Sequence, residues 1–343
     1  MSMIIDFVLP WVDNQDPEWQ KSRQQYAENQ SLSDANSSAR FRDSGTLKYV
    51  LRSIEKNCPW YNKIYLVTCG HHPEWLDINS PKIELVKHSD IYDNKDHLPV
   101  FNSSSIEMSL PNIKGLSEHF VYLNDDTIIF SKTDVERFFV DGKPVDFLCH
   151  GWLARNKLFG MFKELDSWVN SLNNNILLIN KFFNPSTLDN KVLYHKSYST
   201  LNKMSNFLLK NVYRKYFWFE HWHHPIPYLK STLQEVKKYC FDEMQCCSSN
   251  KFRHNTDLTQ YLYRYWRLAK GDFYPYKYND GVETSILTLD VLYNAIKDCE
   301  KSNPKFVCFN DSPNLPDNEY IQMKKETLAF FDKRFPERAS FEL

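Results

Sequence analysis

Glycine is scarce in this chain, with 8 among 343 residues, although proteins usually contain about 7% glycine. The sequence contains neither G-x-G-x-x-G nor G-x-x-x-x-G-K-[ST], the loops whose backbone amides cradle phosphates in many nucleotide-binding proteins. If the protein handles phosphate, side chains and helix ends must therefore hold it.

Net charge and long apolar runs are also missing. The 42 Lys and Arg residues balance 43 Asp and Glu residues, so the chain shows no electrostatic footprint for nucleic acid, and we expect no such partner. No run of about 18 apolar residues occurs, and no basic segment followed by an apolar one begins the chain. The eight cysteines form no C-x-x-C pair, which favours reduced thiols in the cytoplasm. We expect a soluble cytoplasmic protein, with a peripheral contact at the inner face of the membrane left open.

The first part of the chain alternates between strand and helix patterns. Apolar runs predict strands at residues 3–12, 63–68 and 120–123, and alternating apolar and polar residues predict one at residues 82–88. Helical spacing of apolar residues predicts helices near residues 18–28, 47–56 and 104–110. This alternation predicts an α/β fold with a mainly parallel, Rossmann-like sheet flanked by helices.

The pattern changes after residue 131. Residues 160–220 show helix-like apolar spacing, and the next strong strand pattern is at residues 305–309. We therefore expect a catalytic core formed by residues 1–130 and 301–343, with residues 131–300 as a mainly helical insertion or lid that contributes site residues.

Carboxylates follow a predicted strand at Asn124-Asp125-Asp126. Two adjacent carboxylates repel each other, so a fold that keeps them near its core usually supplies a cation, a metal or a proton. A solvated turn is the alternative, because Asn and Asp are common turn residues. The strand at residues 305–309 also ends on Asn-Asp, at Asn310-Asp311. If both strands belong to one sheet, the two edges could face one cleft.

Histidine and arginine clusters could supply the opposite charge. His221, His223 and His224 lie beside two prolines but lack a Cys or H-E-x-x-H partner, which disfavours zinc and leaves a packing, phosphate-binding or proton-transferring role. Arg253, next to His254, could bind a phosphate through both arms of its guanidinium. Asp257 in the same cluster could instead cap a helix.

The ordered set of these motifs is more specific than any one of them. R-F-R-D, F-N-S-S-S-I-E, Y-L-N-D-D, H-H-P, R-H-N-T-D and F-V-C-F-N-D follow one another along nearly the whole chain. The sequence resembles the Stealth family, which includes bacterial capsular polysaccharide phosphotransferases and the catalytic subunit of the lysosomal-targeting N-acetylglucosamine phosphotransferase. The four conserved regions of that family correspond to residues 5–17, 40–130, 219–267 and 306–311.

The resemblance implies a reaction. Stealth enzymes transfer a sugar 1-phosphate from a nucleoside diphosphate sugar, here expected to be a UDP-sugar, to a hydroxyl of an oligosaccharide or polysaccharide. The acceptor oxygen attacks the β-phosphorus, which makes a phosphodiester and releases UMP. A lipid-linked acceptor is left open. The rival readings are a metal-dependent glycosyltransferase, which would release UDP, and a non-catalytic carbohydrate-binding module, which the 15% aromatic content would suit.

The resemblance also implies residue roles. Catalytic roles fall on Asp125, Asp126, His223, Arg253, His254 and Asp257. Substrate-binding roles fall on Trp11, Asp13, Arg40, Asp43, Arg52, Asn102, Glu107, Asn310 and Asp311. We expect Mg²⁺ or Mn²⁺ on Asp125 and Asp126 together with the diphosphate, because hard cations prefer oxygen ligands.

Overall fold

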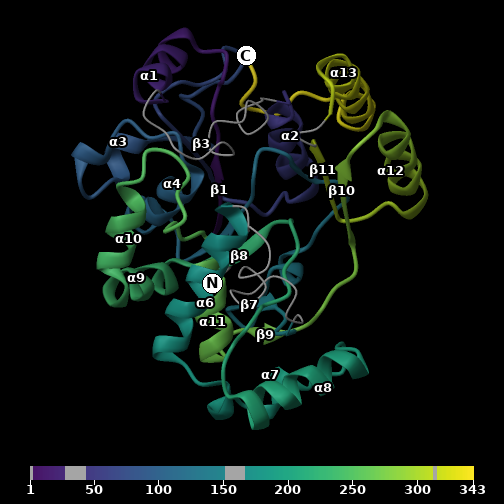
Figure 1. Ribbon diagram of the computed structural model, residues 1–343. Coiled ribbons are helices and arrows are strands. Elements are labelled where there is room, and N and C mark those ends of the chain that lie inside the picture. Colours follow the sequence, from purple (N-terminus) through teal and green to yellow (C-terminus); the bar gives the residue numbers. More distant parts are fainter. Residues whose placement is uncertain (1–2, 28–43, 151–166, 312–314) are drawn as a thin grey trace.

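The computed structural model describes residues 3–27, 44–150, 167–311 and 315–343 (Figure 1). The strands are β1 (Ile5–Pro10), β2 (Ile64–Thr68), β3 (Ile83–Lys87), β4 (His119–Tyr122), β5 (Thr127–Ile129), β6 (Phe139–Val140), β7 (Lys143–Asp146), β8 (Ile226–Leu229), β9 (Tyr274–Pro275), β10 (Gly281–Ile286) and β11 (Phe306–Asp311). The helices are α1 (Pro17–Ala27), α2 (Leu47–Asn57), α3 (His88–Ile91), α4 (Ser103–Ser109), α6 (Ser167–Phe182), α7 (Asn190–Leu193), α8 (Thr200–Leu208), α9 (Lys230–Tyr239), α10 (Phe241–Ser248), α11 (Tyr261–Lys270), α12 (Leu289–Ser302) and α13 (Asp317–Arg334).

The main sheet has the strand order β3-β2-β1-β4-β8. Its first four strands are parallel, with Phe7 of β1 opposite both Ile64 and Val121, and β8 joins β4 antiparallel. The strands β1 and β2 are buried along almost their whole length, which is expected where helices cover both faces of a parallel sheet. The predicted α/β fold with a mainly parallel sheet is therefore confirmed.

The alternation of side chains along β1 builds two hydrophobic cores, one on each face of the sheet. Val8 packs into the core that also holds α6 and α11. Phe7 and Leu9 point to the other core, which includes α2 and the C-terminal helix α13. In that second core Tyr49 of α2 lies against Phe331 of α13, with ring centroids 6.1 Å apart.

A second sheet contains the C-terminal strand. Its order is β10-β11-β5, with β11 parallel to β10 and antiparallel to β5. The strand ending at Asn310-Asp311 therefore does not belong to the main sheet. The two Asn-Asp segments are still neighbours through the second sheet, because the turn Asn124-Asp125-Asp126 leads directly into β5, and Thr127 is opposite Cys308 of β11.

Residues 131–300 contain strands as well as helices, so the expectation of a mainly helical insertion is incomplete. The strand β8 extends the main sheet, β10 extends the second sheet, and β6, β7 and β9 form a third. The sequence does not predict β8 and β10 as strands. The strand β8 carries a proline, as edge strands can, and β10 is mostly exposed or half-buried and so lacks an apolar run. Within the described residues, the helices fall short of the length and apolar character that a bilayer span requires.

Candidate active site

A cavity of about 360 Å³ opens beyond the ends of the parallel strands β1 and β4, where α/β sheets usually bind their ligands. Segments far apart in the sequence line it. They include the residues after β1, the start of α4, the turn after β4, and loops before β8 and α11. The lining residues with polar or aromatic side chains that matter below are Trp11, His88, Asn102, Ser103, Glu107, Tyr122, Asn124, Asp125, Asp126, His223, Arg253, Gln260 and Tyr261.

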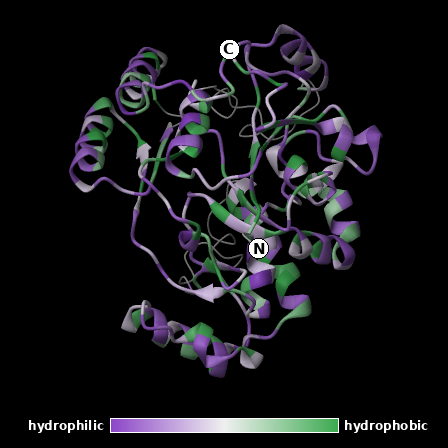
Figure 2. Ribbon diagram, turned by 180° about the vertical axis from the view of Figure 1, so that it is seen from behind, coloured by the Kyte–Doolittle hydropathy of each residue, from purple (hydrophilic) through white to green (hydrophobic). Residues whose placement is uncertain are grey.

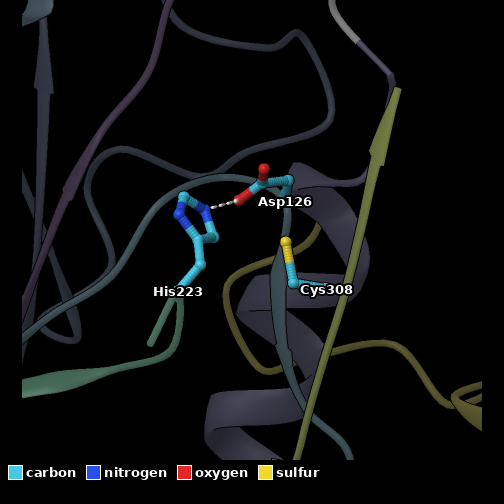
Figure 3. A group of neighbouring side chains, drawn as sticks. All are labelled: Asp126, His223 and Cys308. Atoms are coloured by element: carbon cyan, nitrogen blue, oxygen red, sulfur yellow. Dashed lines mark hydrogen bonds and ion pairs between the residues drawn. The ribbon is translucent and has the colours of Figure 1, made fainter. Parts of the chain in front are cut away.

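Asp126 and His223 form an ion pair in this cavity (Figure 3). The imidazole Nε2 lies 3.3 Å from Asp126 Oδ1, and each side chain is 28% exposed. Burial opposes charge on both groups, but each stabilises the charge of the other. The Asp126 carboxylate raises the pKa of His223 well above its ordinary value, and His223 in turn lowers the pKa of Asp126. The second ring nitrogen of His223 is directed away from this carboxylate (Figure 3).

Cys308 completes a group of three potential ligands. One ligand atom from each of Asp126, His223 and Cys308 lies within 4.8 Å of the others, although the residues come from the β4–β5 turn, the loop before β8, and β11. Burial raises the pKa of the Cys308 thiol to about 12, so the thiol is neutral near pH 7. A neutral sulfur suits Mg²⁺ poorly, whereas the carboxylate of Asp126 and that of Asp125, which also lines the cavity, are suitable ligands for a hard cation.

The loop that carries His223 is fastened to α11 on both sides of the histidine. Arg264 donates to the carbonyl of Glu220 over 3.0 Å, and Arg267 donates to the carbonyl of Pro227. From β10, Glu283 accepts the backbone N–H of His223 over 2.9 Å. These bonds fix the backbone of the loop, so the imidazole is directed at Asp126 before any ligand binds.

Asp146 pairs with both of the arginines that hold this loop. Its carboxylate accepts from Arg264, with a shortest distance of 2.7 Å, and from Arg267. The three side chains are at most 6% exposed. Burial alone would raise the pKa of Asp146, but the guanidiniums of Arg264 and Arg267 outweigh it and hold that pKa below its ordinary value. Both guanidiniums of this buried network therefore pair with one carboxylate, while Arg267 Nε is buried without a hydrogen-bond partner among the described residues.

Glu107 is a second carboxyl group at the cavity. It lies on α4, is 9% exposed, and accepts from the backbone N–H of Gln260 at 2.7 Å and from the Tyr122 hydroxyl at 3.2 Å. Burial raises its pKa to about 7, against the effect of the Gln260 N–H bond. The resemblance assigned this residue to substrate binding, and its pKa also makes it able to take or give a proton near neutral pH.

Asn102 and Asp257 connect two loops at the cavity wall. The Asn102 amide donates to Asp257 over 2.9 Å, and Asp257 also accepts from Asn250 and from the backbone N–H of His254. Asp257 is 1% exposed and burial raises its pKa. It is not among the residues lining the cavity, so the catalytic role expected for it is not supported by its position, which is that of a loop brace.

Arg253 and His254, the two other members of the predicted cluster, differ in their position relative to the cavity. Arg253 lines the cavity and its guanidinium lies 3.3 Å from the Ser103 hydroxyl at the start of α4. His254 is exposed, and its ring bonds to Thr256 over 2.8 Å. Because His254 is outside the cavity lining, the expectation that it acts in catalysis does not fit its placement.

In the first conserved region, only one of the two expected residues reaches the cavity. Trp11 lines it, with its ring 5.2 Å from that of His71. Asp13 lies in the following turn, where its carboxylate accepts from the backbone N–H of Gln15 over 2.8 Å. The backbone N–H of Asp13 donates to His71, and His71 in turn pairs with Asp16. This local network shapes the loop beside Trp11.

Arg52 corrects the sequence-based assignment most clearly. Instead of facing the cavity, its guanidinium forms two bonds to Glu342, at 2.6 and 2.8 Å, and one to the carbonyl of Phe335. Both Arg52 and Glu342 are buried, so the arginine fastens the C-terminal segment to α2 and does not serve as a phosphate contact.

The remaining expected residues belong to the second conserved region and to the end of β11. Arg40 and Asp43 fall outside the described residues. Asn310 is half-buried on β11 and its side-chain oxygen accepts from Cys308 over 3.4 Å. Asp311 ends β11, where its backbone is paired with Ile286.

Sequence reasoning missed residues that carry much of the site. Cys308 is two positions before Asn310, and the period of two along a strand would have placed them on one face. Arg264 and Arg267 are three apart in a helix of mostly aromatic and apolar residues, a spacing that puts both on one side. Asp146 offers no comparable local signal, because its partners are more than 110 residues away.

Comparison with known proteins agrees with the motif order. Stealth protein CR1, conserved region 1, matches residues 3–31, and Stealth protein CR2, conserved region 2, matches residues 40–146; the third and fourth regions stay an interpretation of the motifs. The capsular polysaccharide phosphotransferase WcwK of Streptococcus pneumoniae is 36% identical over 98% of both chains. The exopolysaccharide phosphotransferase cps2G of Lactiplantibacillus plantarum is 32% identical over 98% of this chain and 96% of its own length, and the receptor polysaccharide phosphotransferase WefC of Streptococcus oralis is 34% identical over 99% of both. With such identity over nearly its full length, this chain belongs to the Stealth family.

Proposed function

We propose that this protein transfers a sugar 1-phosphate from a UDP-sugar to a hydroxyl of a growing polysaccharide, during capsule or cell-surface polysaccharide synthesis. The observation that carries the proposal is the convergence of opposite charges on one cavity, with Glu107, Asp125, Asp126, His223 and Arg253 all in its lining. The names of the relatives, which are phosphotransferases of capsular, exo- or receptor polysaccharides, support it. A cytoplasmic location belongs to the same proposal, because all eight cysteines are free thiols.

The proposed step forms one phosphorus–oxygen bond and breaks another. The acceptor hydroxyl oxygen attacks the β-phosphorus, and the bond from that phosphorus to the bridging oxygen breaks. The bridging oxygen keeps the electron pair and leaves as part of UMP, so the product is a phosphodiester. We assign the hydroxyl proton to the second ring nitrogen of His223 in the neutral form of the imidazole. The adjacent Asp126 carboxylate orients the ring and strengthens it as a base. Because the same carboxylate raises the pKa of His223, the pair must lose a proton before it can accept one from the acceptor.

Positive charge must offset the charge on the transferred phosphate. Arg253 supplies one such charge from the cavity wall. Mg²⁺ or Mn²⁺ would be held by the carboxylates of Asp125 and Asp126 with oxygens of the diphosphate, and would neutralise charge there.

The nucleotide product tests the proposal. Incubation with a panel of UDP-sugars and an oligosaccharide acceptor should yield UMP and a phosphodiester-linked sugar, which chromatography and phosphorus NMR would detect. A glycosyltransferase would release UDP instead, so UDP as the sole nucleotide product contradicts the proposal. A carbohydrate-binding module would retain the oligosaccharide and leave the UDP-sugar intact. Omitting the cation and then restoring Mg²⁺ or Mn²⁺ tests the metal requirement in the same assay.

A further inference from the structure

The helix α8 has its polar and apolar faces reversed. A helix on the surface of a globular protein normally turns its apolar face inward. In α8 the inward side chains are polar: Asn206 donates to the carbonyls of Leu148 and Leu193, each over 2.8 Å, and Ser205 donates to the carbonyl of His150 over 3.1 Å. Hydrogen bonds therefore hold the inward face of this helix on the protein, and Leu209, the residue that directly follows it, is buried in the core.

The outward face of α8 and the turn after it is apolar. Leu201 is 71% exposed, and Met204 and Phe207 are each 53% exposed. Their spacing of three residues puts them on one side of the helix. Val212 and Tyr213, in the helical turn Leu209–Tyr213 that follows, continue the exposed apolar set. Of the 17 large hydrophobic side chains exposed within the described residues, these five fall in a stretch of 13, so they form a patch and not a random scatter.

Basic residues flank this apolar patch. Residues 190–219 contain six Lys or Arg residues and no Asp or Glu, although the whole chain has a net charge of −1. The exposed members are Lys191, Lys196, Arg214 and Lys215. Figures 1 and 2 show α8 at the edge of the molecule, on the side opposite α12 and α13. An exposed apolar helix face beside basic residues has the character of a helix that lies in the surface of an anionic membrane.

We propose that α8 and the turn up to Lys215 bind this protein to the surface of an anionic lipid bilayer. Leu201, Met204 and Phe207 would enter the boundary between headgroups and acyl chains, and the basic residues would contact the lipid phosphates. The polar inward face explains why such a helix stays attached to the protein with its apolar side outward.

Fixed contacts connect this surface to the cavity. Residues 148–150, to which α8 is hydrogen-bonded, are themselves bonded to the loop that carries His223. The Cys149 carbonyl accepts the backbone N–H of Glu220 over 2.9 Å. The ring of Phe147 lies 4.8 Å from that of Trp222, the residue before His223. A bilayer bound at α8 would thus be held at a fixed position relative to the site, where a lipid-linked acceptor could reach it.

Vesicle flotation tests the proposal without an activity assay. The wild-type chain should float with vesicles of phosphatidylcholine and phosphatidylglycerol, but not with phosphatidylcholine alone, and salt above about 0.5 M should weaken this binding by screening. An apolar variant combines Leu201→Ser, Met204→Ser and Phe207→Ser, and should bind at least about tenfold more weakly. A basic variant combines Lys196→Gln, Arg214→Gln and Lys215→Gln, and should lose affinity on the order of 100-fold.

Matched controls lie on the opposite side of the molecule. Ile321→Ser removes an apolar side chain that is 66% exposed on α13. The charge control combines Lys297→Gln, Lys301→Gln and Lys325→Gln on α12 and α13. Both controls should float like the wild type, and circular dichroism should show every variant folded.

Absence of wild-type binding to anionic vesicles, or undiminished binding by either the apolar or the basic variant, overturns the proposal. A dimer in sedimentation that the apolar variant abolishes, without vesicle binding, would assign the patch to a second copy of the chain.

Discussion

Two charged clusters flank the loop of His223, and they differ in how far their side chains are exposed to solvent. On the α11 side, Asp146 pairs with Arg264 and Arg267, and the three side chains are at most 6% exposed. On the cavity side, Asp126 and His223 pair at 3.3 Å with 28% of each side chain exposed. The first cluster is closed to solvent and holds the loop in place. The second is open to the cavity, so its proton and its charge are available to a substrate.

Buried charges are costly unless they are paired, so a cluster such as that of Asp146 must keep all its members. A half-buried pair that lines a cavity, such as Asp126 and His223, contributes less to folding stability, and its charges can act on a substrate. The comparison predicts that variants of the two clusters separate stability from activity.

The largest expected effect is on turnover. His223→Ala should lower kcat by about 10² to 10⁴-fold, because it removes the proposed base, while the free energy of unfolding changes by less than about 1 kcal/mol. Steady-state UMP release and urea unfolding would measure the two quantities. His72→Ala is the matched control, since His72 is exposed and lies outside the cavity lining. A variant at His223 that turns over within threefold of the wild type would contradict the assignment.

The reverse pattern is expected at the closed cluster. Asp146→Ala leaves two buried guanidiniums without a counter-charge, and should lower the free energy of unfolding by about 3 to 5 kcal/mol. The control is Asp272→Ala, which breaks an exposed pair with Lys143 and should cost less than about 1 kcal/mol. Urea unfolding midpoints measure both. If the two variants are equally stable, the Asp146 cluster does not make the contribution to folding stability that we expect.

Glu107 lies between these two extremes, since it is buried like Asp146 but lines the cavity like Asp126. Its folded-state pKa of about 7 lies above the ordinary value of 4.5, so its contribution to stability is fully present below pH 4.5 and is lost as the pH rises through 7. The wild type should therefore lose about 3 kcal/mol relative to Glu107→Gln between pH 4 and pH 8. Urea unfolding of both chains at several pH values measures the difference.

A pH-independent difference between those two chains would mean that Glu107 is ionised in the same range whether the chain is folded or not. Tyr122→Phe serves as the control, because it removes the hydroxyl that bonds to Glu107 but leaves the carboxyl group in place. The variant should still lose stability as the pH rises, but over a range shifted to higher pH, because the lost hydrogen bond lowers the pKa of Glu107.

The sequence predicts those features whose signal is local. Each strand of the parallel part of the main sheet follows from a short apolar run, and the run before Asn124 placed Asp125 and Asp126 at the edge that lines the cavity. The weaker strands β8 and β10 were missed because tertiary pairing, and not an apolar run, makes them strands.

Motif order predicted more of the site than local chemistry did, but it could not tell a ligand contact from a brace. His223 and Arg253 line the cavity as expected, whereas Asp257 and Arg52 do not. Both of the latter are bonded to distant partners as well, since Asp257 accepts from Asn102, 155 residues away. The Glu342 partner of Arg52 is 290 residues away, so only the folded chain shows that this guanidinium is occupied.

The smallest expected effect tests that distinction. Arg52→Met should lower the free energy of unfolding by about 2 kcal/mol, through loss of charge-assisted hydrogen bonds to Glu342, and should leave KM for the UDP-sugar unchanged. Glu342→Gln is the matched variant, and the double variant should cost less than the sum of the two, because they break one interaction. Arg253→Met should show the opposite result, with little change in stability and a clear loss of turnover. If Arg52→Met raises KM, and if its loss of stability adds to that of Glu342→Gln, Arg52 belongs to the substrate site. A residue that only holds the fold together changes stability, whereas a phosphate contact changes substrate binding.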